Sequence, residues 1–310
     1  MLKNKKLAFF MAAVFAAASL PCQAAETWVL SGPDGWENVQ DSPQGAFLLA
    51  ISKIKQQIEA GNSRQAIRAL EGLKIDYPQF DGPDLDLFIE AETLYSKTVL
   101  SKAARQYNRI LTEHPDSPLY AAASERLYSI GAAYAGGQKR AFLKILRFPA
   151  HDEGEKILRG LADRGGNSPL AYRCLLTVAE NQERRDLFLD AYQTWAEIAD
   201  RWPTGEYGRQ ALLRMAQSLH AAYTSPHFDA TVLRGAASYF EDYQQRYPDS
   251  ARQLEIPDTL DLIVEQQAYR HFFTGLYYER LEKEDAATMY YERVAADWPG
   301  TKAADMADRH

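Results

Sequence analysis

Apolar residues recur along the chain with the spacing of helices, in six copies of one pattern. In each copy a large residue follows a small one after four positions, and another apolar residue follows after three more, so that all three share one helical face. A helix breaker closes each copy. The copies are Ala66, Leu70, Leu73, Pro78; Ala103, Tyr107, Ile110, Pro115; Gly154, Leu158, Leu161, Gly166; Ala191, Trp195, Ile198, Pro203; Ala236, Phe240, Tyr243, Pro248; and Ala287, Tyr291, Val294, Pro299.

This pattern predicts how each helix packs and where it ends. The small residue lets a neighbouring helix come close, and the large residue fills the space beyond it. Proline ends the helix because it lacks an N–H group and clashes with the preceding turn. The residue before the proline is aromatic, as in Trp202-Pro203, or is His114. We expect this ring to fold back on its own helix.

A second helical stretch precedes each copy, so the repeated unit is predicted to be a helix–turn–helix pair. These stretches cover 47–60, 85–97, 119–134, 169–182, 207–223 and 263–281. The intervals between breakers are 37, 51, 37, 45 and 51 residues, lengthened by inserts at 136–151 and 250–257. A basic period of about 34 residues with these marks is typical of tetratricopeptide repeats. Strand-like alternation is nowhere sustained. We therefore predict an all-α fold, a tetratricopeptide-repeat α-solenoid of five to six repeats, each stacked on its neighbours.

The N-terminus has the pattern of a cleaved signal peptide. Three lysines precede an apolar stretch over 7–20, which is too short to span a membrane. Small residues place the cleavage between Ala24 and Ala25. The predicted domains are a signal peptide at 1–24, an extended lead-in at 25–46 and a superhelical repeat domain at 47–310. Trp28 and Trp36 are expected to pin the lead-in to the first repeat.

Cys22 leaves a second interpretation of this region open. Bacterial lipoproteins are cut just before a cysteine that is then acylated, and one acyl chain would help to anchor the protein. The residue before Cys22 is Pro21, where that processing needs a small residue. After cleavage at Ala24 only Cys174 remains, in an apolar helical setting, where we expect a buried thiol rather than a reactive one.

Charge and motifs argue against several classes of function. The chain has a net charge of −7, which becomes −10 without the three N-terminal lysines, and it has no basic cluster, so we expect no nucleic-acid partner. It has no phosphate-binding loop, dinucleotide fingerprint, metalloprotease helix or nucleophile elbow. His220 and His227 are separated by Pro226 and do not form a metal site. We expect no enzyme activity, catalytic residue, metal, cofactor or small-molecule substrate.

Several segments resemble BamD-like outer-membrane-protein assembly factors of Gram-negative bacteria. The repeat ends DYPQFDGPD (76–84), HPDSPLY (114–120), RYPDSA (246–251) and DWPGTKAADMA (297–307) are of this kind. The more specific matches are the lead-in TWVLSGPDGWENVQDSP (27–43) and the insert FLKILRFPAHDEGEKIL (142–158). The resemblance implies a periplasmic scaffold at the inner face of the outer membrane. Its partners would be a BamA-like barrel insertase and unfolded outer-membrane proteins.

The resemblance also implies a peptide groove in the N-terminal repeats, along the first helix of each pair. Its candidate residues are Leu48, Ile51, Lys55, Ile58, Leu85, Phe88, Glu92 and Tyr95. Apolar side chains there would accept the alternating aromatic residues of a β-signal. Family members are usually lipid-anchored by an N-terminal cysteine. Because Pro21 precedes Cys22, association with the membrane would be peripheral or through partners.

Two other functions compete with this interpretation. The first is another periplasmic repeat scaffold, in envelope division or peptidoglycan synthesis, which the closing segment WPGTKAADMADRH also fits. The second is an enzyme whose site is not recognisable from its motifs. The tyrosine pairs 277–278 and 290–291 are open to two interpretations, as packing between long helices or as the lining of a peptide groove.

Overall fold

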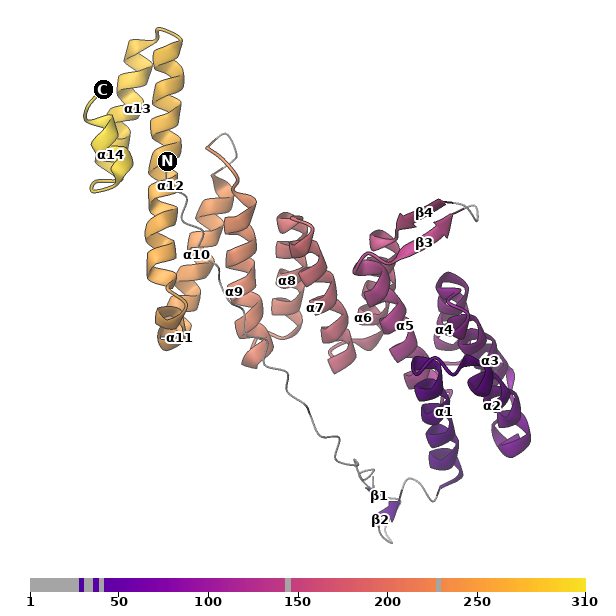
Figure 1. Cartoon of the computed structure of the whole chain (residues 1–310). Coiled ribbons are helices and arrows are strands. Elements are labelled where there is room, and N and C mark those ends of the chain that lie inside the picture. Colours follow the sequence, from indigo (N-terminus) through magenta and orange to yellow (C-terminus); the bar gives the residue numbers. More distant parts are fainter. Residues whose placement is uncertain (1–27, 31–35, 39–41, 143–145, 227–229) are drawn as a thin grey trace, which may run out of the picture. The chain divides into compact units, whose positions relative to one another are not determined.

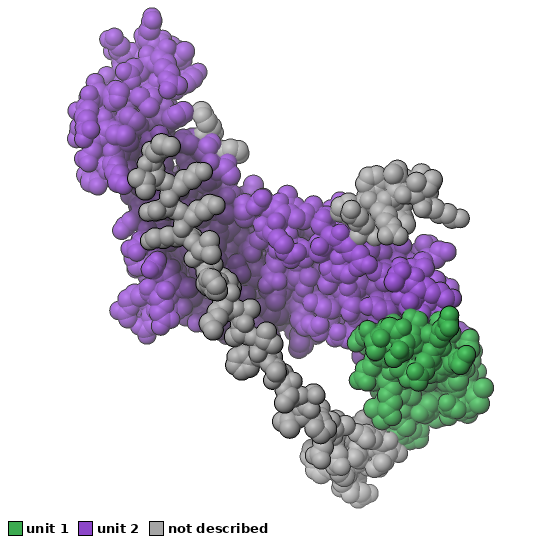
Figure 2. All heavy atoms as spheres, in the orientation of Figure 1, with its two compact units in different colours: residues 1–82 green, residues 83–310 purple. Residues whose placement is uncertain are grey.

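The computed structural model describes residues 28–30, 36–38, 42–142, 146–226 and 230–310, with side chains for 42–138, 150–226 and 230–310. The chain divides into two compact units, residues 1–82 and 83–310 (Figure 2). The break falls at Gly82-Pro83, inside the range that the sequence predicts as one domain. The predicted signal peptide, its cleavage site at Ala24 and Ala25, and Cys22 lie outside the described residues.

The described residues of unit 1 form one helix pair. Two short strands, β1 (Trp28–Leu30) and β2 (Trp36–Asn38), pair antiparallel ahead of it, with Val29 opposite Glu37. Helix α1 (Pro43–Glu59) packs on α2 (Ser63–Asp76), which the 3-10 helix η2 (Pro78–Phe80) follows. Phe47 holds this unit together, since its ring stacks on Phe80 at 4.6 Å and meets the edge of Tyr77 at 5.5 Å.

Unit 2 contains five helix pairs, drawn from purple to yellow in Figure 1. Each pair packs internally and on the next pair in the chain. The pairs are α3 (Pro83–Ser96) with α4 (Leu100–Glu113); α5 (Tyr120–Ala135) with α6 (His151–Gly165); α7 (Pro169–Arg184) with α8 (Phe188–Arg201); α9 (Gly205–Ala222) with α10 (Thr231–Arg246); and α12 (Ile256–Arg280) with α13 (Glu284–Asp297). The short helices α11 (Pro248–Gln253) and α14 (Lys302–Ala307) flank the last pair.

The described residues therefore have the predicted all-α repeat fold of tetratricopeptide type, with six helix pairs. Predicted and observed helices agree closely at most ends but differ at two starts. Helix α1 begins at Pro43 rather than at 47, because Ser42 accepts a hydrogen bond from the amide of Gly45 and proline suits the first helical turn. Helix α12 begins at Ile256 rather than at 263, and Pro257 again lies in the first turn.

The repeated apolar pattern forms the core of every pair, as predicted. The small, large and apolar positions of all six copies are buried, and Trp195 and Tyr107 are completely inaccessible. The small position matters most at Gly154, where an added Cβ would lie 2.2 Å from the amide nitrogen of Ala135 and 2.6 Å from the carbonyl of Gly131. Helices α5 and α6 therefore touch backbone to backbone at this point.

The residues before the breaker prolines share one helix-ending geometry. Tyr77, His114, Trp202, Tyr247 and Trp298 have φ between −135° and −130° and ψ between 56° and 72°. Each amide still donates to the carbonyl four residues earlier, so the helix closes fully before the proline. The copy without proline ends differently, at Gly166 with φ 53°.

The rings before the prolines do not all fold back as predicted. Tyr247 lies on Tyr243 of its own helix, with ring centroids 5.1 Å apart. Trp202 instead meets the edge of Tyr172 on α7, and Trp298 stacks on His271 of α12 at 4.8 Å. These two tryptophans, like Tyr77 beside Phe47, pack on the first helix of their own pair because it offers them an aromatic surface.

The turns inside five of the six pairs share one geometry. In each of these five, a left-handed residue donates its amide to the carbonyl three residues earlier. These residues are Gly61, Thr98, Gly137, Asp186 and Glu282, with φ from 57° to 99°. The next amide reaches back to a carbonyl five residues earlier, as from Val99 to Leu94 at 2.9 Å, which completes a Schellman motif. Glycine suits this position, whereas a β-branched residue such as Thr98 is strained there.

The insert at 136–151 forms a β-hairpin, which the sequence did not predict. Strands β3 (Lys139–Phe142) and β4 (Leu146–Pro149) pair antiparallel, with Arg140 opposite Phe148. The sequence analysis predicted neither these strands nor β1 and β2, although the all-α fold class holds. Strands of three or four residues are too short to give a recognisable alternation of apolar and polar positions.

Candidate functional site

The groove residues predicted in unit 1 are only partly accessible. Ile51 and Ile58 of α1 are buried against α2 in the core of the pair. Leu48 and Lys55 lie on the same helix with part of each side chain accessible. Of these four predicted residues, Leu48 and Lys55 are therefore the ones that a partner can contact.

The groove residues predicted in unit 2 are mostly buried as well. Leu85, Phe88 and Glu92 of α3 are completely inaccessible, and Phe88 meets the edge of Tyr107 on α4. Tyr95 is the one that stays partly accessible. Core and groove stripes both recur every three or four residues on a helix, so spacing alone did not separate them. Peptide binding at Leu48, Lys55 and Tyr95 remains a prediction.

Glu92 belongs to a buried polar cluster instead. Its carboxylate accepts two hydrogen bonds from Arg126 of α5, at 2.8 and 3.0 Å, and one from the hydroxyl of Tyr107 at 2.8 Å. The guanidinium of Arg126 lies 4.4 Å from the ring centre of Tyr95. The cluster thus joins the first helices of two successive pairs.

The charges of this cluster hold each other in place. Burial by itself lowers the pKa of Arg126, but the hydrogen bond and charge of Glu92 outweigh burial and raise it above the ordinary value. Burial and the neighbouring Glu92 raise the pKa of Tyr107. With Glu92 and Arg126 almost completely inaccessible, these groups position helices rather than react with a ligand. Sequence reasoning missed Arg126, although a single arginine inside an apolar helix was a usable signal.

The next two first helices, α5 and α7, are joined at an exposed position. Arg173 of α7 pairs with Glu125 of α5 at 3.1 Å and lies 4.3 Å from the ring centre of Tyr128. The hydroxyls of Tyr128 and Thr177 are 3.1 Å apart. Burial lowers the pKa of Arg173, and the charges of Glu125 and Tyr128 raise it to a net value above the ordinary one.

Helices α7 and α9 are joined through Glu183 and Tyr172. Glu183 accepts hydrogen bonds from Trp195 at 2.8 Å and from Arg214 and Ser218 at 3.3 Å. Tyr172 donates to Gln210 at 2.9 Å and stacks on Tyr207. One step further, His220 of α9 lies 2.9 Å from Gln266 of α12. The first helices of unit 2 therefore form one continuous row, α3–α5–α7–α9–α12.

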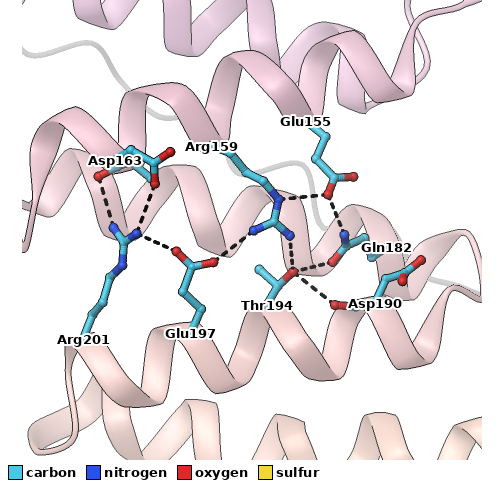
Figure 3. Close-up of polar contacts among 9 residues, drawn as sticks. Glu155, Arg159, Asp163, Gln182, Asp190, Thr194, Glu197 and Arg201 are labelled. Atoms are coloured by element: carbon cyan, nitrogen blue, oxygen red, sulfur yellow. Dashed lines mark hydrogen bonds and ion pairs between the residues drawn. The ribbon is translucent and has the colours of Figure 1, made fainter.

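The second helices are joined by a separate polar network, shown in Figure 3. Arg159 of α6 contacts Glu155, Glu197 and Thr194, the last two on α8. Thr194 donates to Gln182, whose amide donates to Glu155. Arg201 bridges Glu197 and Asp163. Every charged group of this network has a partner, so the network fixes the packing of α6, α7 and α8.

Several exposed apolar side chains lie on α12. Leu262, Tyr269 and Tyr277 are 50%, 40% and 55% exposed, and their spacing of seven and eight places them along one side of the helix. On this side an open hollow of about 370 Å³ lies between α9 and α12, lined by Leu213, Gln217, His220, Ala221, Phe240, Leu254, Ile256, Thr259 and Leu262. A second, separate hollow of about 290 Å³ lies beside Gln266 and Tyr269 on the same helix.

The tyrosine pairs at this end serve both packing and surface. Tyr278 stacks on Tyr290 of α13 at 5.5 Å, and Tyr291 is buried with its hydroxyl 2.7 Å from Glu279. Tyr277 faces solvent. Three of the four tyrosines therefore pack between helices, and only Tyr277 is placed where it could line a binding surface.

Cys174 is buried, as expected, and burial raises the pKa of its thiol to about 12. Across the described ranges, three or more histidine, cysteine and acidic side chains nowhere gather as they would around a metal ion. None of the described helices combines the length and apolar character needed to cross a membrane.

Comparisons with known proteins leave the family open. No family model and no curated protein matches the chain. Among solved structures, a crystal structure of PilW, described as a widely conserved type IV pilus biogenesis factor, is 17% identical, with 84% of this chain and 97% of that chain covered and a TM-score of 0.32. A human IFIT1 dimer with m7Gppp-AAAA is 12% identical, with 86% and 79% covered and a TM-score of 0.26. Similarity at this level says nothing about function, and the fold assignment rests on the repeat geometry described above.

Proposed function

We propose that this chain is a non-catalytic scaffold of the bacterial periplasm that binds partner proteins in the assembly and insertion of outer-membrane β-barrel proteins. The observation that carries the proposal is the continuous row of first helices. A row joined by the buried pair Glu92–Arg126, the exposed pair Glu125–Arg173 and the contact Tyr172–Gln210 presents its remaining side chains as one extended surface. Extended surfaces of stacked repeats are what such proteins use for binding.

The pathway and the compartment are taken from the sequence. The lead-in at 27–43 and the insert at 142–158 resemble BamD-like assembly factors, and the N-terminal pattern indicates export. In this proposal Leu48, Lys55 and Tyr95 contact unfolded outer-membrane proteins, and a BamA-like insertase is the second partner. The protein would be held at the inner face of the outer membrane through these partners, or by an acyl chain on Cys22.

Depletion in the native cell tests the pathway. We expect levels of folded outer-membrane β-barrels to fall, and crosslinked pull-downs from envelopes to contain a large barrel insertase. In the alternative function, a scaffold of envelope division or peptidoglycan synthesis, the pull-down contains cell-wall enzymes and barrel levels stay normal. That second result would overturn the proposal.

The intact mass of the purified mature protein tests the anchor separately. Cleavage between Ala24 and Ala25 gives an unmodified chain, whereas acylation gives a chain that begins at Cys22 and carries the added lipid mass. Either mass is compatible with the scaffold function, so this measurement decides only how the protein is held at the membrane.

A further inference from the structure

We propose that the groove between α9 and the N-terminal half of α12 is a docking site for an amphipathic helical segment of a partner protein, with apolar residues on one face and lysine or arginine beside them. This inference does not depend on the outer-membrane pathway. The proposed site lies outside the groove that the resemblance to BamD-like factors implies.

The floor of the groove is apolar and already shaped. Phe240 and Ile256 are buried beneath it, and Leu213 of α9 lies along one wall. Leu254 and Leu262 stand at the opposite wall with about half of each side chain exposed, at 47% and 50%. A partner that covers these leucines removes apolar surface from water, which favours binding.

The wall on α12 suits a helical segment. Thr259 and Leu262 line the first hollow and Gln266 and Tyr269 the second, and all four lie on one face of the helix. Such a wall accepts residues spaced three and four apart on a partner helix. His220, which lines the first hollow, lies 2.9 Å from Gln266, which lines the second, so α9 and α12 touch between the two hollows.

Acidic residues at the edge of the groove, here called the rim, indicate that the partner carries positive charge. Glu255 directly precedes α12, and Asp258 and Asp261 lie on its first two turns; all three are exposed, and none forms an ion pair with the described residues. Asp258 is a direct neighbour of Leu262 because residues four apart meet on a helix. The nearest basic side chain of the short helix α11, Arg252, is paired with Asp249. A rim of unpaired acids around an apolar floor matches a partner with basic residues around an apolar face.

The other acid near Leu262 already has a structural role. Glu265 accepts hydrogen bonds from the amides of Lys302 and Ala303, at 2.9 and 3.0 Å, and so caps the start of α14. It does not contribute a free charge to the rim. The test therefore changes Asp258 and Asp261 and leaves Glu265 intact.

The probe is a labelled synthetic helix of roughly 15 residues with leucines on one face and lysines beside them, since shorter helices form poorly. A matched peptide has glutamate in place of each lysine. Binding to the full chain is measured by fluorescence anisotropy. We expect the lysine peptide to bind at least about tenfold more tightly than the glutamate peptide, and its affinity to fall as salt rises.

Two variants and two controls locate the site. Leu262→Glu is expected to weaken binding at least about tenfold, and Asp258→Lys with Asp261→Lys about tenfold with less salt dependence. Leu189→Glu on α8 is the matched control, since Leu189 is 53% exposed against 50% for Leu262. Asp200→Lys on the same helix, compared with Asp258→Lys alone, controls for the change in charge. Equal affinity for both peptides would overturn the proposal. So would an equal loss of affinity in L262E and L189E when circular dichroism shows both variants folded.

Discussion

Arg126 of α5 meets Glu92 of α3 through two parallel hydrogen bonds at a place where both side chains are almost completely inaccessible. The pair is the deepest of the contacts that join successive first helices. A buried ion pair adds little to the stability of the fold compared with an apolar pair of similar volume. Removing one partner is nevertheless strongly destabilising, because the other charge stays buried without a partner. It therefore favours one way of stacking α3 on α5.

Removing one partner should destabilise the protein strongly. We expect Arg126→Met to lower the free energy of unfolding by about 3–5 kcal/mol, because Glu92 is left as an unpaired buried charge. The double variant Arg126→Met, Glu92→Leu should lose less than Arg126→Met alone. Urea unfolding of the variants measures the difference.

The exposed pair of the next two helices is the control for this test. Arg173 and Glu125 are 47% and 45% exposed, so Arg173→Met should cost no more than about 1 kcal/mol. Equal losses in R126M and R173M would show that burial of the first pair has no energetic importance.

The close approach of α5 and α6 makes a second prediction. Gly154→Ala should destabilise by about 3 kcal/mol, because the new Cβ would meet the backbone of Ala135 and Gly131. Gly160→Ala on the same helix has nothing within 4 Å of the added atom. That control should stabilise by about 0.5–1 kcal/mol through helix propensity. A stable G154A protein would contradict the backbone contact.

The shared turn geometry predicts that substitutions at equivalent positions of two repeats change stability in opposite directions. Thr98→Gly should stabilise by about 1 kcal/mol, because threonine is strained at φ 57°. Gly61→Ala, at the equivalent turn with φ 80° and open space around the Cβ, should destabilise by about 1 kcal/mol. Thermal unfolding checks both, and changes of the same sign would contradict a common left-handed turn.

His271 makes a prediction about pH. Burial lowers the pKa of His271, and the charge of Arg293 lowers it further. The unfolded chain, with a histidine pKa of about 6.5, then binds more protons than the folded one, so stability is lost as pH falls below that value. His271→Phe keeps a ring against Trp298 and should reduce the loss of stability between about pH 7.5 and about pH 5.5. An unchanged pH dependence in H271F would show that His271 does not contribute.

The helix pairs could be predicted from the sequence because two independent signals agree. Helical spacing marks the buried face of each second helix, and proline marks its end. The start of α1 was also readable, since Ser42-Pro43 is a helix-start signal that apolar spacing alone overlooks.

The parts that could not be predicted lack a local signal. The strands of the hairpin at 139–149 are too short for alternation to be recognised. The prediction of groove residues was inaccurate for another reason. Phe88 and Tyr95 on α3 both fit helical spacing, and only the contacts between helices show that Phe88 is buried and Tyr95 is partly accessible. Arg126 and Glu92 are 34 residues apart, and no motif links them.

The central claim is that the row of first helices is the surface that binds other proteins. A photo-crosslinking amino acid placed at Tyr95, on a first helix, tests it most directly in the native cell envelope, with Asn108 on the second helix α4 as the exposed control. The account predicts discrete crosslinks from Tyr95 to a barrel insertase or to unfolded outer-membrane proteins, and none from Asn108. Crosslinks to those proteins from Asn108 and none from Tyr95 would contradict it.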